Sequence, residues 1–344
     1  MRRTALLAAG LVLTAVVVVG VAFRASDARL VERDEFLMGT LIQAKAFGRL
    51  APRALEEVFA RLREVEARMT INAPGSELGA VSDNAGKSPV KVSPDTFLVI
   101  EKAVHYAALT GGRFDPTIAP LVSLWHIGFP DARVPGSAEI TSALERVSYR
   151  NVLLDPAKST VYLTEKGMGL DLGAIAKGFA ADEAISIFKK HRLTSALISL
   201  GGNVSSLGAK ADGKPWRVGI QDPLDTKGAY MATLETTGDT LVTSGAYERF
   251  LEVDGKRYHH ILDPDTGYPA ESDLLSATIV AGASIDADAL STSAFILGRD
   301  KALRLVEDLP GTEAILIDKD RVVWVTSGLK KRLQIVDNSY TMAP

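Results

Sequence analysis

The sequence predicts an α+β fold in which mixed and antiparallel sheets pack against helices. Two observations lead to this fold class. Predicted strands and helices are interspersed without the regular spacing of βαβ units, and several neighbouring strands are separated by short turns typical of hairpins. The clearest turn is Asp254-Gly255, a dipeptide strongly favoured in two-residue hairpin turns. The chain has 344 residues, of which 47% are hydrophobic, so it can bury a substantial core.

The first 29 residues are predicted to lie outside the folded unit, which spans residues 30–344. Two arginines precede residues 4–23, an uncharged run rich in Leu, Val and Ala that is long enough to cross a bilayer as a helix. The arginines should stay in the cytoplasm, so the folded unit is expected to be extracytoplasmic, on the periplasmic side. A cleaved signal peptide is the alternative, and it leads to the same compartment. The length of the apolar run favours an uncleaved anchor in the cytoplasmic membrane.

The composition excludes several classes of function. The formal net charge is −3, so no basic excess supports nucleic-acid binding. The chain has no cysteine, which excludes disulfides, thiolate metal sites and a lipidated N-terminal cysteine. Its histidines show no zinc-site spacing, and the glycine-rich dinucleotide and triphosphate motifs and the GxSxG motif are absent.

The first half of the chain is predicted to form a strand, two helices and a hairpin. Residues 36–47 are expected to form one strand, interrupted at Gly39 where a backbone or ligand can approach closely. Apolar residues at helical spacing predict a helix over residues 52–69, followed by a turn-rich segment. The remaining predicted elements are a helix from 94 to about 109, a glycine-rich loop at 110–117, a surface excursion at 129–137, and hairpin strands at 152–154 and 160–164.

The second half is predicted to contain further strands and three helices. One helix is expected to begin near Asp171 and to end at about His191, and another to begin at Ser284 and to end at Gly298. The remaining predicted elements are strands at 195–200, 216–220, 230–236, 243–253, 256–262 and 276–281, a helix at 299–308 and a hairpin around 318–320.

The helix predicted to begin at Ser284 contains the first candidate site. Asp288 and Thr292 are four residues apart, so a helix places them on one face. A carboxylate and a hydroxyl, with no Cys or His nearby, suit a hard cation such as Mg²⁺ better than zinc. The alternative is an aspartate that caps a surface helix or is solvated, and this stretch alone favours that alternative.

A second candidate site lies at the helix that begins near Asp171. Its first turn holds Ala174 and Lys177. Helix N-termini present free N–H groups that suit a phosphate or diphosphate, and Lys177 would add positive charge. The alternative is that Asp171 only caps the helix and that Lys177 is solvated.

A third candidate is His260, which lies at a predicted strand end, three residues before Asp263 in a tight turn. A histidine in such a place is usually structural, and the neighbouring His259 points to the opposite face of the strand. His260 also suits general acid–base catalysis, since its pKa range allows proton transfer near neutral pH.

Eight short motifs, taken together and in order, resemble the ApbE family, the FAD:protein FMN transferases. They are spread from about Phe36 to Gly298, and their number and order make the resemblance strong although each motif alone is weak. The motifs are Met38-Gly-Thr40, Ser76-Glu77-Leu78, Gly111-Gly-Arg-Phe-Asp-Pro-Thr117 with Trp125 after it, Asp171-Leu-Gly-Ala-Ile-Ala-Lys-Gly178, Leu200-Gly-Gly-Asn203, Thr243-Ser-Gly-Ala-Tyr-Glu-Arg249, His260-Ile-Leu-Asp-Pro-Asp-Thr-Gly-Tyr-Pro269 and Asp288-Ala-Leu-Ser-Thr292.

The resemblance implies an ApbE-like, T-fold-like structure and an Mg²⁺-dependent transfer of FMN from FAD to a threonine hydroxyl of a target flavoprotein, with release of AMP. The target is expected to be a subunit of a membrane redox complex. The implied metal ligands are Asp288, Thr292 and an oxygen of Ala174, with Asp286 as a further ligand. The implied FAD-binding residues are Met38, Asn72, Phe114, Asp115, Asp171, Lys177, His260, Ile261 and Thr266. The implied catalytic residues are Lys177, His260 and Asp263, the last two for positioning or deprotonating the acceptor hydroxyl.

The chain departs from the family pattern in two places. Many members carry tyrosine where this chain has Asn72, and an asparagine cannot stack on a flavin as an aromatic ring can. The lipoprotein cysteine usual in the family is also absent, so anchoring would depend on residues 4–23. The alternatives to flavin transfer are an FAD pyrophosphatase, which would give FMN and AMP, and a non-catalytic periplasmic flavin carrier.

Overall fold

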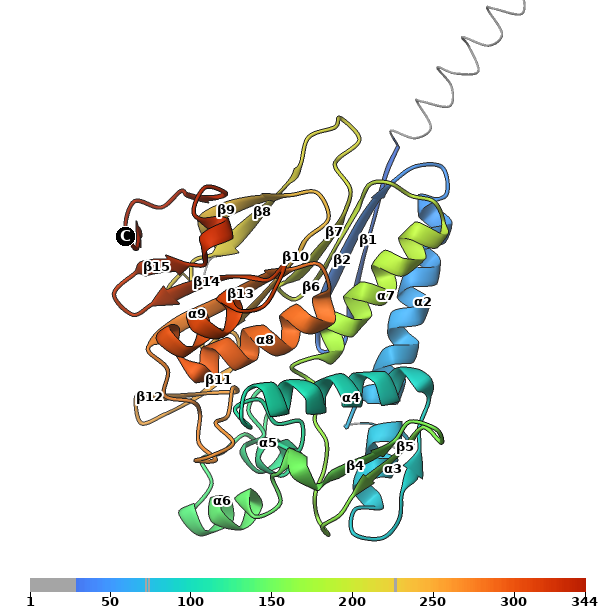
Figure 1. Cartoon of the computed structure of the whole chain (residues 1–344), viewed down its shortest axis with the longest axis vertical. Helices are drawn as coiled ribbons and strands as arrows, with labels where there is room; N and C mark the ends of the chain where they lie inside the picture. Colours follow the sequence, from blue (N-terminus) through green and yellow to red (C-terminus); the bar gives the residue numbers. More distant parts are fainter. Residues whose placement is uncertain (1–28, 72, 74, 226–227) are drawn as a thin grey trace, which may run out of the picture.

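The computed structural model describes residues 29–71, 73, 75–225 and 228–344, and it has the predicted α+β architecture (Figure 1). Its centre is a nine-stranded mixed sheet in which all neighbouring strands are antiparallel except the last pair. In spatial order the strands are β1 (Leu30–Leu37), β2 (Thr40–Phe47), β6 (Ala196–Leu200), β7 (Asn203–Leu207), β10 (Thr240–Gly245), β13 (Leu274–Ala281), β14 (Glu313–Asp318), β15 (Val322–Val325) and β17 (Thr341–Met342).

The predicted single strand at 36–47 is wrong, because a hairpin turn divides it. Met38 and Gly39 both have positive φ, of 53° and 70°, which is the backbone of a two-residue hairpin turn. β1 pairs with β2 from Leu37↔Thr40 to Leu30↔Phe47, so the first strand begins six residues before the predicted one. The glycine was therefore a turn signal rather than an interruption.

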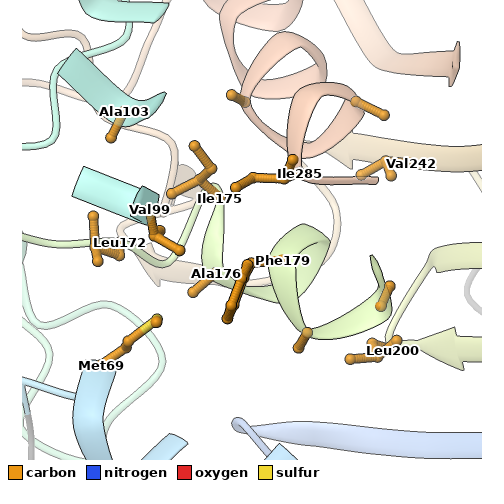
Figure 2. Packing of buried hydrophobic residues seen from close by; sticks show 14 of the residues in the cluster. Met69, Val99, Ala103, Leu172, Ile175, Ala176, Phe179, Leu200, Val242 and Ile285 are labelled. Carbon is orange, nitrogen blue, oxygen red and sulfur yellow. The ribbon is translucent and has the colours of Figure 1, made fainter. Parts of the chain in front are cut away.

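Helices cover one face of the sheet and enclose the main core. These are α2 (Ala51–Met69), α7 (Ala176–Lys190), α8 (Ser284–Leu297) and α9 (Arg299–Glu307), and the predictions at 52–69 and 299–308 are confirmed to within a residue (Figure 1). Leu55, Val58 and Phe59 on α2 are among the fully buried side chains, as the helical spacing predicted. Figure 2 shows Ile175, just before α7, beside Ile285 of α8 in this core.

A small sheet packs against the other face. It has the order β16 (Leu333–Ile335), β9 (Tyr230–Thr236), β8 (Trp216–Gln221). Its side chains, including Val218 and Leu234, join Leu241 and Ile315 of the large sheet in a second core cluster. The nine-stranded sheet is therefore buried on both faces over part of its width, which explains the near-continuous apolar run of β13.

A lobe of short elements lies beside the ends of α7 and α8 (Figure 1). The predicted helix at 94–109 and the predicted hairpin are confirmed, and residues 129–136 are irregular as expected, whereas the helices at 77–83, 119–125 and 137–144 were not predicted. The lobe consists of α3 (Glu77–Asp83), β3 (Val90–Lys91), α4 (Pro94–Leu109), α5 (Ala119–Trp125), α6 (Ser137–Leu144), η1 (Tyr149–Asn151), β4 (Val152–Asp155) and β5 (Thr160–Leu163).

The predicted strand at 243–253 is also wrong. β10 ends at Gly245, a turn occupies residues 246–249, and β11 (Phe250–Val253) then pairs with β12 (Lys256–His259) across the predicted Asp254-Gly255 turn. β7 was not predicted either. Among the helices of the described part of the chain, none is long and apolar enough to cross a membrane, and the apolar run at 4–23 lies outside the described residues.

Candidate active site

Asp288 lies at a close junction between the N-terminal ends of α7 and α8. Its side chain is only 2% exposed, and its Oδ2 accepts a hydrogen bond of 2.8 Å from the Gly178 N–H. The junction requires glycine, because a Cβ on Gly178 would lie 2.2 Å from the Ser284 carbonyl oxygen. Lys177 Nζ lies 3.9 Å from Asp288 Oδ1, so the buried carboxylate faces a cation.

Thr292 follows Asp288 by one helical turn, as the sequence predicts. Its Oγ1 lies 3.1 Å from Ser244 Oγ of β10, which also lies 2.8 Å from Ser291 Oγ. Ala174 lies in the turn that leads into α7, and Lys177 Nζ donates to the Gly173 carbonyl oxygen over 3.1 Å. Carboxylate, hydroxyl and carbonyl oxygens thus belong to the segments that meet at this junction.

Asp286 does not belong to this cluster, which corrects the expectation that it is a further metal ligand. Residues two apart on a helix point in nearly opposite directions. Asp286 instead accepts from Lys102 Nζ of α4 over 2.8 Å. The start of α8 is capped from α7, because the carboxylate of Asp182 accepts from the N–H groups of Ser284 and Ile285 over 2.8 and 2.9 Å. Asp288 is therefore not the helix cap that the alternative interpretation proposed.

Asp171 lies just before the turn into α7. Its Oδ1 accepts from the Gly173 N–H over 2.6 Å. Burial raises the pKa of its carboxyl, while this hydrogen bond and the charges of Arg249 and Lys177 oppose that rise. Asp171 both orders the turn, as the capping alternative proposed, and lies in the electrostatic field of the two cations.

His260 is a neutral imidazole with one nitrogen available to accept a proton. Its Nδ1 lies 3.2 Å from the Arg249 carbonyl oxygen, which can only accept, so Nδ1 carries the hydrogen and Nε2 is the basic nitrogen. Burial and the positive charges of Arg249 and Lys177 lower the pKa of His260 to about 3. It therefore stays unprotonated at neutral pH.

The sequence prediction missed Glu248 and Arg249, in the turn between β10 and β11. Solvent reaches the Glu248 side chain, yet the surrounding protein raises the pKa of its carboxyl to about 7, against the opposing effect of Lys177 and Arg249. The pattern of residues 243–253 predicts a continuous strand, and this prediction conceals the turn. Gly245 was the available signal, because glycine inside a strand pattern often marks a break.

The turn after His260 is held by an ion-pair network. Arg113 Nη1 lies 3.1 Å from each carboxylate oxygen of Asp263, and its Nη2 lies 2.8 Å from Asp265. Asp263 Oδ1 also accepts from the Asp265 N–H over 2.8 Å. Trp125 Nε1 donates to the Gly267 carbonyl oxygen over 2.8 Å. The carboxylate of Asp263 is thus used to fix the turn, which leaves His260 as the better candidate base.

Asp115 is also occupied within the protein. Its Oδ1 accepts from the Thr117 N–H and hydroxyl over 2.8 and 2.6 Å, and its Oδ2 accepts from the Tyr149 N–H over 2.8 Å. This carboxylate shapes the loop that also carries the buried Phe114. Thr266 Oγ1 accepts from the Tyr268 N–H over 3.3 Å, while Ile261 is buried.

Met38 lies at the tip of the β1–β2 hairpin, and its N–H donates to Glu66 Oε1 over 2.7 Å. This tip borders the turn after β6, since a Cβ on Gly201 would lie 2.1 Å from Thr40 Oγ1. The neighbouring Gly202 lies close to Glu248, because a Cβ on Gly202 would lie 3.7 Å from Glu248 Oε1. The hairpin tip therefore belongs to the same region as the Glu248 turn. Asn72 lies outside the described residues.

The oxygen donors at the α7–α8 junction fit Mg²⁺ in chemistry. They comprise one carboxylate (Asp288), one hydroxyl (Thr292) and one carbonyl (Ala174), and Mg²⁺ is commonly held by one or two carboxylates together with substrate phosphates and water. In the described part of the chain, no group of three or more His, Cys, Asp or Glu side chains could hold a metal by itself. The arrangement thus suits a metal shared with an anionic substrate.

Comparisons with known proteins agree with this arrangement. The chain matches the ApbE family over residues 38–316. It is 40% identical over 327 residues to an FAD:protein FMN transferase of Treponema pallidum, covering 90% of each chain, and 37% identical over 318 residues to one of Klebsiella pneumoniae, covering 92% and 98%. An ApbE protein structure from Thermotoga maritima superposes with a TM-score of 0.82 at 32% identity, over 88% of this chain and 99% of that one. The flavin transferase ApbE from Vibrio cholerae gives 0.80 at 27% identity, over 89% and 99%.

Proposed function

The chain belongs to the ApbE family and is an FAD:protein FMN transferase, and we propose that it moves FMN from FAD to a threonine hydroxyl of a target flavoprotein in an Mg²⁺-dependent reaction that releases AMP. The observation that carries this proposal is the pairing of a buried carboxylate with Lys177 at the α7–α8 junction, together with a neutral His260 in the field of the same lysine. One part suits a metal and a diphosphate. The other offers an unprotonated imidazole, whose basicity would rise when the negative charge of a bound diphosphate offsets Lys177 and Arg249.

The proposed reaction forms one bond to phosphorus and breaks another. The threonine oxygen bonds to the phosphorus that carries the flavin, the P–O bond to the AMP phosphate breaks, and AMP leaves as an anion. The hydroxyl proton passes to Nε2 of His260, since threonine is a weak nucleophile until it loses that proton. The cations Lys177 and Arg249 stabilise the negative charge that develops on the phosphate oxygens.

We assign the metal to Asp288, Thr292 and the carbonyl oxygen of Ala174. When bound, Mg²⁺ supplies Lewis-acid polarisation of the diphosphate. Asp288 already has one oxygen bonded to the Gly178 N–H, so the carboxylate is fixed before any metal binds. Asp286 is left out of the ligand set because Lys102 neutralises it on the other side of α8.

We further propose that FAD lies along the surfaces that surround this junction. Lys177, Asp171 and His260 contribute polar contacts near the diphosphate. We assign the remaining contacts to Met38, Asn72, Phe114, Ile261 and Thr266. Asp115 and Asp263 act indirectly, by fixing the loops on which Phe114, Ile261 and Thr266 lie. Because asparagine cannot stack on the flavin as an aromatic ring can, Asn72 should give weaker flavin binding than a tyrosine at the same position.

We also propose that residues 4–23 anchor the chain and that the folded unit acts on the periplasmic side. The acceptor is then an extracytoplasmic threonine, as in a subunit of a membrane redox complex. The support is the uncharged run of residues 4–23 and the two arginines before it.

The test incubates the full chain with FAD and Mg²⁺, with and without a candidate acceptor, and follows FMN and AMP by chromatography and acceptor mass by mass spectrometry. Transfer predicts an acceptor that gains one FMN on threonine and little AMP without the acceptor. Rapid FMN and AMP release without acceptor would establish the pyrophosphatase alternative instead. FAD that is bound by the protein yet stays intact in every mixture would establish a carrier.

A further inference from the structure

One end of the molecule carries a concentration of basic side chains, here called the basic end. Four segments make it up: residue 29, residues 48–57, residues 189–194 and residues 208–215. The basic residues of these segments are Arg29, Arg49, Arg53, Lys189, Lys190, Arg192, Lys210 and Lys214, against the acidic residues Glu56, Glu57 and Asp212. This local excess contrasts with the net charge of −3 of the whole chain.

The sheet and helices bring these segments together. Residue 29 precedes β1, whose first residue pairs with the last residue of β2, and the Gly48 N–H donates to the Arg29 carbonyl oxygen over 3.0 Å. Gly48 also borders Leu193, because a Cβ on Gly48 would lie 3.3 Å from Leu193 Cδ2. Gly208 borders Thr194 in the same way, since a Cβ on Gly208 would lie 2.0 Å from the Thr194 carbonyl oxygen. In Figure 1 this end is at the top, where β1, α2 and α7 reach the same level.

The charges of the basic end are largely uncompensated. Among the described residues, Lys190 alone of the eight forms an ion pair, with Glu57, which also accepts from His191. Seven of the eight are exposed and Lys210 is half-buried. The exposed Leu50 lies among them. A surface of this kind attracts an extended anionic partner rather than a single acidic side chain.

The chain itself indicates which anionic surface this is. The apolar run ends at residue 23 and β1 begins at Leu30, so six residues connect them. Such a connector spans roughly 20 Å at most when fully extended. If residues 4–23 cross the membrane, the basic end is the part of the fold held nearest to the lipid headgroups.

We propose that the basic end binds anionic phospholipid headgroups and sets the orientation of the enzyme on the membrane. This inference rests on the proposed membrane anchor. β1 runs from the basic end to the Met38 turn, a distance of about 26 Å for eight residues at 3.3 Å each. The site therefore lies at the far end of the first strands, directed away from the lipid surface.

The absence of cysteine allows a clean distance measurement on the full chain. A single Leu50→Cys substitution carries a donor dye, and the chain is reconstituted in vesicles with an acceptor dye on a fraction of the headgroups. Energy transfer is expected to be higher in vesicles containing phosphatidylglycerol than in pure phosphatidylcholine. Raising the salt from about 50 mM to about 500 mM should remove most of that difference, because screening weakens surface electrostatics.

Charge reversal tests which residues are responsible. Arg49→Glu, Arg53→Glu and Arg192→Glu, combined, are expected to lower the ratio of docked to undocked molecules about tenfold or more in anionic vesicles. The matched control reverses Lys87, Lys91 and Lys166, which are exposed in the lobe of short elements, and should keep the wild-type value. Energy transfer that is equal in both lipids, or unchanged in the basic-end variant, would overturn the proposal.

The readouts keep this inference separate from the proposed activity. FMN transfer to an acceptor in detergent should be the same for the wild type and the basic-end variant, which also shows that the variant is folded. A wild type that transfers FMN normally but shows no lipid dependence counts against docking alone, whereas absent transfer in the wild type counts against the function. If mass spectrometry shows that the anchor is cleaved, co-sedimentation of the mature chain with the same vesicles replaces energy transfer, and equal pelleting in both lipids refutes the proposal.

Discussion

The α7–α8 junction and the turn at residues 246–249 meet in one site but are built in different ways. At the junction, the Asp288 carboxylate is buried and already bonded to a backbone N–H, and Gly178 leaves no room for a side chain. In the turn, Glu248 and Arg249 are exposed, and neither forms an ion pair within the described residues. The first region is held in place by its own contacts before a ligand binds, whereas the second presents charges that a ligand would complete.

This difference separates two ways in which a substitution can act. A change at the junction alters packed, buried groups, so it should affect stability as well as activity unless it preserves shape and hydrogen bonding. A change in the turn should affect activity or pH dependence with little effect on folding, because few native contacts are lost. The four predictions that follow test this distinction, in order of decreasing effect.

Asp288→Asn should abolish most activity and spare the fold. The amide keeps an oxygen to accept from Gly178 but removes the charge that a metal needs, so FMN transfer should fall by about 10³-fold or more. The melting temperature should change by only a few degrees. Asp288→Ala also leaves the buried N–H unpaired and should cost roughly 1–3 kcal/mol of stability as well. An Asn variant with normal Mg²⁺-dependent transfer would remove Asp288 from the ligand set.

His260→Gln should lower the rate of transfer by about 10²-fold or more, because the proton acceptor is lost. Its amide can still donate to the Arg249 carbonyl oxygen, so the melting temperature should change little. The matched control is His259→Asn, whose shorter side chain cannot reach the Ala270 carbonyl oxygen that Nε2 contacts over 3.1 Å, so this variant should lose more stability than rate. Equal rate losses in both variants would argue that His260 is structural.

Gly178→Ala should damage the junction by overpacking. The added methyl group would lie 2.2 Å from the Ser284 carbonyl oxygen, which is backbone and cannot rotate away, so α7 and α8 must separate. The expected cost is about 1–3 kcal/mol of unfolding free energy, with a loss of activity of about tenfold. Gly238→Ala is the control, since its Cβ would meet nothing within 4 Å. Denaturant unfolding of both variants measures the difference, and equal stabilities would contradict the close junction.

Glu248→Gln should produce the smallest effect, visible only as a function of pH. The pKa of Glu248 is raised from 4.5 to about 7 in the fold, so between those values the folded state holds a proton that the unfolded state has lost. The wild type should therefore lose stability relative to the variant as pH rises from about 4.5 to about 7. The effect should be modest, because solvent reaches this side chain. Melting temperatures at pH 5 and pH 8 test the sign, and a wild type that gains relative stability with rising pH would contradict it.

The helical parts of the site could be predicted from local spacing, and the rest could not. Asp288 and Thr292 share a face because a helix repeats every 3.6 residues, and the same geometry already separates Asp286 from them. The ion pair of Asp263 could not be predicted, because its partner, Arg113, lies 150 residues away in the chain. No local pattern reports such a contact. Glu248 was missed because a strand pattern was extended across a turn.

The strands of the large sheet follow one another in space in the same order as in the chain. A sheet ordered in this way can grow by addition at one edge while the chain is being synthesised. The longest interruption of that growth is the first, since β2 ends at Phe47 and its partner β6 begins at Ala196. The closure of this long loop is expected to be the slow event of folding, because the chain loses conformational entropy on closing the loop before the strand pairs can stabilise it. Until then the β1–β2 hairpin exposes an unpaired edge, which makes the partly synthesised chain prone to aggregation.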